Sequence, residues 1–133
     1  MEETMAGHDT AIEVKPWGST QLLLFDGVCQ VNRIHVVDCG YSSRHLHRTK
    51  VNVFTVLRGR LEVVTYHERR SGSLRAMSEV ILSPGQSTSV DAGTIHRFMA
   101  FGPTEALEAY YAHGATEVSL DDIVRFDSNG VFV

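Results

Sequence analysis

The sequence predicts an all-β fold, a sandwich or a barrel, because short apolar segments recur along the chain with turn-forming residues between them. Val53-Phe54-Thr55-Val56-Leu57 is typical of these segments, since β-branched and aromatic residues dominate it. Glycine turns such as Asp26-Gly27 and Pro84-Gly85 separate the segments. The predicted strands lie near Thr20–Phe25, Val28–Val37, Val51–Leu57, Leu61–His67, Glu79–Leu82, Thr88–Val90, Ile95–Phe101 and Ala106–Ala112.

The chain length predicts one domain. With 133 residues and 43% hydrophobic content, the chain can bury one apolar core. No linker, repeat or low-complexity segment divides it, so we expect a single domain over residues 11–133 and a flexible tail over residues 1–10. The only helical signal is Ser119-Leu120-Asp121-Asp122, which starts with a capping residue and places acids in the first turn. We expect one short C-terminal helical turn there.

Charge and hydropathy argue against several classes of partner. The formal net charge of −4 gives no reason to expect nucleic acid, and no apolar run is long enough to span a bilayer. The segment Met1–His8 is acidic and poor in apolar residues, unlike a signal peptide. Cys29 and Cys39 form neither a disulfide framework nor a CxxC pair. We therefore expect a cytoplasmic protein whose cysteines are small reduced thiols.

Two histidines two positions apart suggest a metal site. On a strand such residues point to the same face, so His45 and His47 can converge on one point. Asn52 lies an odd number of positions beyond His47 and joins them only if a turn or bulge intervenes at residues 48–50. His96 lies on another predicted strand. Three imidazoles and one oxygen would suit a divalent metal, although the HxH spacing is also common in surface histidine pairs.

Glycines and histidines recur in two groups. The first reads Gly40-x4-His45-x-His47-x4-Asn52-x6-Gly59, and the second reads Gly85-x5-Asp91-x-Gly93-x2-His96-x3-Ala100. They resemble the two motifs of the cupin superfamily, usually written G-x5-H-x-H-x3,4-E-x6-G and G-x5-P-x-G-x2-H-x3-N. The first gap is one residue short, Asn52 replaces Glu, and Asp91 and Ala100 replace Pro and Asn.

The cupin resemblance implies a single-domain double-stranded β-helix, also called a jelly-roll barrel. It also implies a divalent transition metal inside the barrel, with zinc, manganese, iron and nickel as the candidates. The implied ligands are His45, His47, Asn52 and His96. A neutral amide lacks the charge that helps to hold a divalent ion, so we expect weaker metal binding than in relatives with Glu. If Asn52 does not coordinate, three imidazoles and water still make a reasonable open site.

The two ends of the domain narrow the resemblance. Lys15-Pro16-Trp17-Gly18 and the later segment Asp121-Asp122-Ile123-Val124-Arg125 are similar to the ends of the type II mannose-6-phosphate isomerase-like cupins. Those proteins usually carry Gln at the position of His45 and Glu at the position that aligns with Tyr110. The resemblance implies a metal-dependent isomerase that acts on a sugar phosphate.

An isomerase of this kind needs groups that remove and return a carbon-bound proton. Glu62, Glu108, Tyr66 and Tyr110 are the candidates in the sequence. Glu108 and Tyr110 share one strand face, so both enter the barrel or neither does. We select Tyr110 and Glu108 as the catalytic candidates, with solvent-facing positions as the alternative.

A phosphate group would require arginine or lysine. The available residues are Arg44, Lys50, Arg58, Arg97 and Arg125. We select Arg125, which the resemblance favours, and Arg97 as candidates for substrate binding. A salt bridge from Arg125 to Asp121 or Asp122 is the alternative.

Three functions are compatible with the sequence. The first is a metal-dependent isomerase or epimerase of a sugar or sugar phosphate, and the second is an iron-dependent dioxygenase. The third is a non-catalytic cupin that binds a sugar or a small acid, because this fold hosts many chemistries. We also expect a homodimer, formed by packing of barrel faces or by exchange of an N-terminal strand within Ala11–Trp17.

Overall fold

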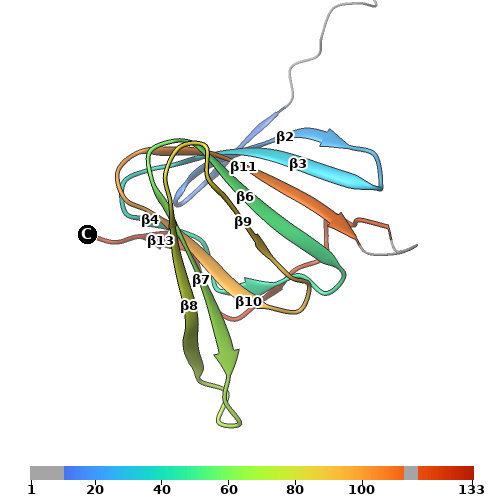
Figure 1. Cartoon of the computed structure of the whole chain (residues 1–133), viewed down its shortest axis with the longest axis vertical. Coiled ribbons are helices and arrows are strands. Elements are labelled where there is room, and N and C mark those ends of the chain that lie inside the picture. The colour runs from blue at the N-terminus through green and yellow to red at the C-terminus, as the bar shows by residue number, and fades with distance from the viewer. Residues whose placement is uncertain (1–10, 113–116) are drawn as a thin grey trace, which may run out of the picture.

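Two antiparallel sheets form the fold in the computed structural model of the chain, which describes residues 11–112 and 117–133 (Figure 1). One sheet has the strand order β1-β2-β3-β11-β6-β9. The other has the order β12-β5-β10-β4-β13, with β7 pairing to β10 and β8 pairing to β7. The strands are β1 (Ile12–Lys15), β2 (Gly18–Phe25), β3 (Cys29–Val36), β4 (Gly40–Tyr41), β5 (His45–Leu46), β6 (Lys50–Arg58), β7 (Leu61–Glu68), β8 (Leu74–Leu82), β9 (Ser87–Val90), β10 (Ile95–Ala100), β11 (Thr104–Ala112), β12 (Val124–Arg125) and β13 (Gly130–Val131).

The all-β prediction is confirmed, and every predicted strand overlaps an observed one. The N-terminal strand expected within Ala11–Trp17 is β1, although its exchange between subunits stays a prediction. The two-residue strands β4, β5, β12 and β13 were not predicted, because strands this short show no periodicity. Sequence analysis also began β8 five residues late, at Glu79 instead of Leu74. The predicted tail, residues 1–10, lies outside the described residues.

The predicted C-terminal helical turn is wrong. Residues 119–122 form a hydrogen-bonded turn, and no helix occurs among the described residues. The polar groups of this segment bond to other parts of the chain: the Ser119 carbonyl accepts from Lys50 Nζ and the Asp122 carbonyl accepts from His47 Nδ1. The capping signal was therefore overridden by tertiary hydrogen bonds. No described helix is long and apolar enough to cross a membrane.

The interior of the barrel is divided into a polar half and an apolar half. Along β3, β6, β10 and β11, the inward-facing positions are polar at one end and apolar at the other, and the register places like residues side by side. Tyr110 is paired with Gln30 and Asn52, whereas Ala106 is paired with Ile34 and Val56. The apolar core contains Trp17, Ile34, Val36, Phe54, Val56, Leu61, Val63, Leu82, Val90, Phe98, Ala100 and Ala106.

Exposed apolar residues on the β7–β8 hairpin and on strand β1 could take part in subunit contacts. The β7–β8 hairpin extends away from the rest of the barrel (Figure 1), and Met77 on β8 is 61% exposed. On the edge strand β1, Ile12 and Val14 are exposed. These positions are compatible with the expected homodimer, which stays a prediction.

Gly59→Ala should destabilise the fold more than Gly72→Ala. Both glycines occupy turns between consecutive strands and have a positive φ, +84° and +90°, which costs a residue with a Cβ about 1–2 kcal/mol. A Cβ at Gly59 would also lie 2.5 Å from the Pro103 carbonyl oxygen, whereas a Cβ at Gly72 meets nothing within 4 Å. Urea unfolding of the two variants measures the difference in the free energy of unfolding. Equal losses of unfolding free energy in the two variants would show that the close backbone contact at Gly59 adds no cost.

Candidate metal centre

Three buried histidines meet inside the polar half of the barrel. His45 on β5 is the register partner of His96 on β10, so the two side chains share one face of the sheet. His47 directly follows β5 and joins them. The possible ligand nitrogens of the three rings lie within 4.8 Å of one another. The structure thus brings together the three histidines that sequence analysis selected as ligands.

Each histidine ring is oriented by a hydrogen bond from its Nδ1 atom to a backbone carbonyl. A carbonyl can only accept, so Nδ1 carries the proton and the lone pair is at Nε2. The Nε2 atom of His47 is buried and has no hydrogen-bond partner among the described residues. Metal-binding histidines usually show this arrangement. The acceptors are the carbonyls of Ser43 for His45 (2.7 Å), Asp122 for His47 (2.7 Å) and Thr94 for His96 (2.9 Å).

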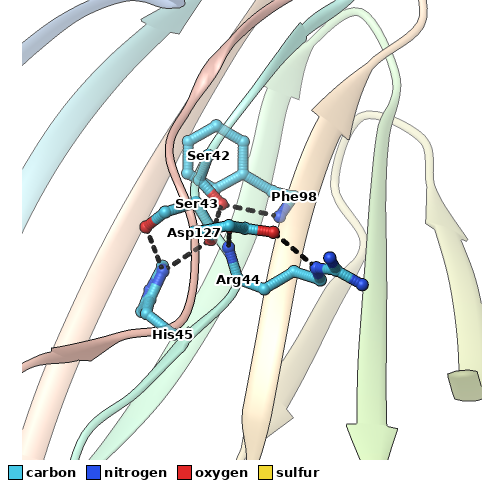
Figure 2. A network of polar contacts seen from close by, with 6 residues as sticks. All are labelled: Ser42, Ser43, Arg44, His45, Phe98 and Asp127. Carbon is cyan, nitrogen blue, oxygen red and sulfur yellow. Dashed lines mark hydrogen bonds and ion pairs between the residues drawn. The ribbon is translucent and has the colours of Figure 1, made fainter. Parts of the chain in front are cut away.

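The segment that precedes His45 is fixed by its own hydrogen bonds, which Figure 2 shows. The Ser42 hydroxyl accepts from the backbone N–H of Phe98 at 3.1 Å and donates to the Ser43 carbonyl at 3.0 Å. The Ser43 carbonyl is also the acceptor for His45 Nδ1. The orientation of the His45 ring is therefore tied to the backbone of β10.

The C-terminal segment is bound to the loop that carries His47. The Asp122 carboxylate accepts from the backbone N–H groups of Arg48 at 2.7 Å and Thr49 at 2.9 Å. Next to it, the Arg44 backbone N–H and guanidinium bind the Asp127 carboxylate at 2.7 Å and 2.6 Å (Figure 2). These contacts hold Leu120 and Ile123 at the wall of the cavity.

Burial keeps the three rings neutral. Desolvation lowers the pKa of His47 and of His96 to about 4. It also lowers the pKa of His45 well below 6.5, an effect to which the neighbouring rings of His96 and His47 add. Neutral imidazole is the form that binds a metal, so the rings are ready to coordinate at neutral pH.

Asn52 completes the polar surface beside the histidines. It is fully buried, and its Nδ2 atom lies 3.4 Å from His96 Nε2 and 3.4 Å from the Tyr110 hydroxyl. The chain bends at residues 48–49 and begins β6 at Lys50, so a turn and not a bulge brings Asn52 to the histidine face. The buried Oδ1 atom has no hydrogen-bond partner in the described part of the chain. A half-turn of the amide would present this oxygen to the histidines, and coordination by Asn52 stays a prediction.

A cavity of approximately 200 Å³ opens next to the histidines. Strand β1 and the C-terminal segment contribute part of its wall. The lining residues are Glu13, Lys15, Trp17, Thr20, Gln30, Asn32, Ser42, Ser43, His45, His47, Lys50, Phe98, Glu108, Tyr110, Leu120, Asp122, Ile123, Arg125 and Asn129.

Both catalytic candidates line this cavity. The Tyr110 hydroxyl donates to the Glu108 carboxylate at 3.0 Å, and the Tyr110 ring centroid lies 5.1 Å from that of His47. Burial raises the pKa of Glu108, although the hydrogen bond from Tyr110 opposes this shift. Burial and the nearby Glu108 raise the pKa of Tyr110 well above its usual value. The other two candidates, Glu62 and Tyr66, do not line the cavity.

The two arginine candidates lie on different sides of the sheet. Arg125 is the register partner of His45 and lines the cavity. Arg97 follows His96 on β10 and therefore points to the other face, where its guanidinium lies over the Tyr41 ring at 5.5 Å. Arg97 therefore does not line this cavity, whereas Arg125 does.

Sequence analysis did not select Lys50 as a site residue, yet Lys50 is a buried cation in the cavity. Its Nζ atom donates to Gln30 Oε1 at 3.1 Å and to the Ser119 carbonyl at 2.8 Å, and it lies 4.3 Å from the centre of the Tyr110 ring. Burial lowers the pKa of Lys50. Lys50 lies close to the HxH motif in the sequence, which could have suggested a place in the site. Its hydrogen-bond partners, however, are brought together only by folding.

A comparison with family models decides the family. Residues 34–113 match the model described as a cupin domain, which is more than half of the chain. This chain belongs to the cupin family. No curated protein matches it.

Solved structures share the cupin fold at low sequence identity. KdgF from Halomonas sp. is 19% identical with a TM-score of 0.62, and the alignment covers 81% of this chain and 89% of KdgF. CapF, the capsular polysaccharide assembling protein from Staphylococcus aureus, is 16% identical with a TM-score of 0.71, covering 96% of this chain and 34% of CapF. Oxalate decarboxylase from Lactobacillus farciminis is 14% identical with a TM-score of 0.69, covering 89% of this chain and 34% of that enzyme. The cupin chain thus spans about a third of the latter two proteins.

The residues of this cupin fit the divalent metal that the fold implies. Three Nε2 lone pairs are directed away from the carbonyl-bound Nδ1 atoms, and the one on His47 is buried without a partner in the described structure. A three-imidazole set with further open positions is typical of catalytic zinc and related metals. The structure therefore supports a divalent metal site in this cupin, and the identity of the metal stays open.

The metal-free cupin should lose stability as the pH falls from about 6.5 to 4. The pKa values of His47 and His96 are lower in the folded state than in the unfolded state, so unfolding takes up protons in this range. A shift from 6.5 to about 4 corresponds to about 3 kcal/mol per ring. Glu108, with its raised pKa, acts in the opposite direction. Thermal unfolding of the chelator-treated wild type and of His47→Gln measures this effect. The stability of the variant should depend less on pH than that of the wild type, and identical pH dependences would contradict the neutral buried state of His47.

His47→Ala should abolish metal binding and leave the fold intact. The wild-type cupin should contain about one divalent ion per chain, and the variant should bind it at least about 100-fold more weakly. Elemental analysis of protein purified without an affinity tag measures the metal, and circular dichroism measures the fold. His67→Ala, which removes an exposed histidine on β7, is the matched control. Unchanged metal content in His47→Ala would refute the site.

Proposed function

We propose that this cupin is a metal-dependent isomerase or epimerase that moves a carbon-bound proton in a small polyhydroxy carbonyl compound, such as a sugar or a sugar phosphate. The observation that carries the proposal is the buried Glu108–Tyr110 pair beside the histidines. Burying a carboxyl group is costly. A site that only held a structural metal would not need this pair in the cavity wall.

The histidines would hold the metal through their Nε2 atoms. Zinc, manganese, iron and nickel are the candidates, and the bound ion would act as a Lewis acid that polarises a carbonyl oxygen of the substrate. The hydrogen bonds from Nδ1 to the backbone would keep the rings in place during the reaction. The residues of the cavity would then supply the proton transfers.

Glu108 is the proposed base. Its raised pKa makes the ionised carboxylate a better proton acceptor than an ordinary surface glutamate. It would remove the proton from the carbon next to the carbonyl and return it to the former carbonyl carbon. The hydroxyl proton of the first carbon moves to the former carbonyl oxygen, so the net change is an aldose–ketose isomerisation. Tyr110 stays protonated because its pKa is raised, so its O–H can donate to Glu108 or to a substrate oxygen.

Two segments near the ends of the domain support an isomerase or epimerase reaction. The segments Lys15–Gly18 and Asp121–Arg125 resemble those of the type II mannose-6-phosphate isomerase-like cupins, and residues from both segments line the cavity. The resemblance favours an isomerase over the iron-dependent dioxygenase. No feature of the described site favours a dioxygenase in particular.

A non-catalytic cupin that binds a sugar or a small acid is the second candidate. It is favoured by Asn52, because an amide where other cupins usually carry Glu leaves the metal without a charged ligand. The two functions differ in whether Glu108 is needed for turnover.

Glu108→Gln should abolish proton exchange without loss of metal. The metal-loaded wild type should exchange a carbon-bound proton for deuterium in at least one member of a panel of aldose–ketose pairs, their phosphates and the matching uronic acids. The variant should slow this exchange by about 10²- to 10⁴-fold, the usual contribution of a general base. Proton NMR in D₂O measures the exchange.

Glu62→Gln is the matched control for Glu108→Gln, because Glu62 is a partly buried carboxyl whose pKa is also raised by burial but which lies outside the cavity. It should leave the exchange rate unchanged. A metal-loaded wild type that exchanges no proton in any compound of the panel would contradict the isomerase and favour the binding protein.

A further inference from the structure

We propose that the cavity selects ligands that carry a carboxylate, which the Arg125 guanidinium binds while the hydroxyl or carbonyl oxygens of the same molecule face the histidines. This inference rests on the proposed metal centre and specifies its substrate class. It replaces the sugar phosphate as the expected ligand with a small polyhydroxy acid.

The position of Arg125 places a ligand group next to the histidines. In the sheet, Arg125 on β12 is paired with His45 on β5, and His45 is paired with His96 on β10. Residues directly opposite one another project from the same face, and neighbouring strands lie roughly 5 Å apart. A row of three side chains therefore runs from the guanidinium to the metal-binding rings. One small molecule can contact both ends of this row.

Arg125 is the one arginine of the cavity wall, and it forms no hydrogen bond or ion pair with another described residue. The alternative suggested by the sequence, a salt bridge from Arg125 to Asp121 or Asp122, is not formed among the described residues. The Asp122 carboxylate accepts from backbone N–H groups instead. The other arginines with assigned contacts are held elsewhere: Arg44 by Asp127, Arg33 and Arg58 by Glu105, Arg60 over Phe101 and Arg97 over Tyr41.

The two lysines of the cavity wall are already bonded. Lys15 forms an ion pair with Glu13 at 3.0 Å, and Lys50 donates to Gln30 and to the Ser119 carbonyl. The guanidinium of Arg125 thus supplies donors that no described residue uses. Its two parallel N–H groups match the two oxygens of one carboxylate. The volume of approximately 200 Å³ also favours a small ligand over a larger phosphorylated one.

The charges in the cavity favour an anion once a metal is bound. Glu13 is neutralised by Lys15, and Asp122 is bonded to the loop at residues 48–49. The formal charges of the wall balance before a metal binds, so a divalent ion would make the cavity net positive. The charged residues are the acids Glu13, Glu108 and Asp122 and the bases Lys15, Lys50 and Arg125. Since Asn52 is neutral, the histidine site contributes no negative charge either. A carboxylate on the ligand would supply the missing anion.

The test compares three ligands that share one hydroxylated six-carbon chain. D-gluconate ends in a carboxylate, D-glucitol ends in a neutral CH₂OH group, and D-glucitol 6-phosphate ends in a phosphate. None can isomerise, so the experiment measures binding and not turnover. Trp17 is the single tryptophan of the chain and lines the cavity, so its fluorescence reports binding to the zinc-loaded protein. Gluconate should bind at least about tenfold more tightly than the other two, as expected for a charge-assisted hydrogen-bond pair.

Arg125→Gln should remove this preference. Gluconate should lose about tenfold or more in affinity, glucitol should bind as before, and Arg125→Lys should restore part of the preference because it keeps the charge. Arg75→Gln is the matched control, since it removes the same charge from an exposed position on β8.

The possible failures are distinct. Zinc-loaded protein that binds gluconate no better than glucitol, or that prefers the phosphate, would overturn the inference and leave the metal centre intact. An equal loss for gluconate and glucitol in Arg125→Gln would also overturn it. Elemental analysis that finds no zinc after loading would refute the metal centre and this inference together.

Discussion

The hydrogen bonds from three Nδ1 atoms to backbone carbonyls determine what the cavity of this cupin can do. They fix the tautomer of each ring and direct three Nε2 lone pairs into one volume. Two acceptors lie two residues before their histidines, at Ser43 and Thr94, so each belongs to the segment that delivers the ring. The third is the Asp122 carbonyl, which is 75 residues from His47 in sequence. The C-terminal segment is thus part of the metal centre and not an appendage of the barrel.

The division of the barrel interior allows such a site to exist. Three uncharged imidazoles, a buried ammonium and a buried carboxyl are all costly to desolvate. The apolar half, with the fully buried Ile34 and Phe54 at its centre, lies further along the same strands and offsets this cost. Since the two halves are separate, substitutions in the polar half should change chemistry more than stability. This separation is the physical reason why one barrel can support many reactions.

Much of the site could be predicted because alternation along a strand is simple. Alternation placed His45 and His47 on one face of a strand. It also placed Glu108 and Tyr110 on one common face, although only the structure shows that this face points into the barrel. The same rule would have excluded Arg97, since a neighbour of the inward-facing His96 must point outward. The role of Lys50 and the turn at Ser119 could not be predicted. Both depend on hydrogen bonds between segments about 70 residues apart, for which a single sequence carries no signal.

The replacement of an acid by Asn52 and the burial of Glu108 are connected. Where related cupins usually place Glu at the positions of Asn52 and Tyr110, this chain has an amide and a phenol, and its interior carboxylate is Glu108. The three residues form a chain of hydrogen bonds: Asn52 Nδ2 donates to the Tyr110 hydroxyl, which donates to Glu108. The negative charge therefore lies two hydrogen bonds beyond Asn52 instead of beside the histidines. A carboxylate in that position is not consumed as a metal ligand, so it is free to accept a proton, and the charge missing at the metal is left for the ligand to supply.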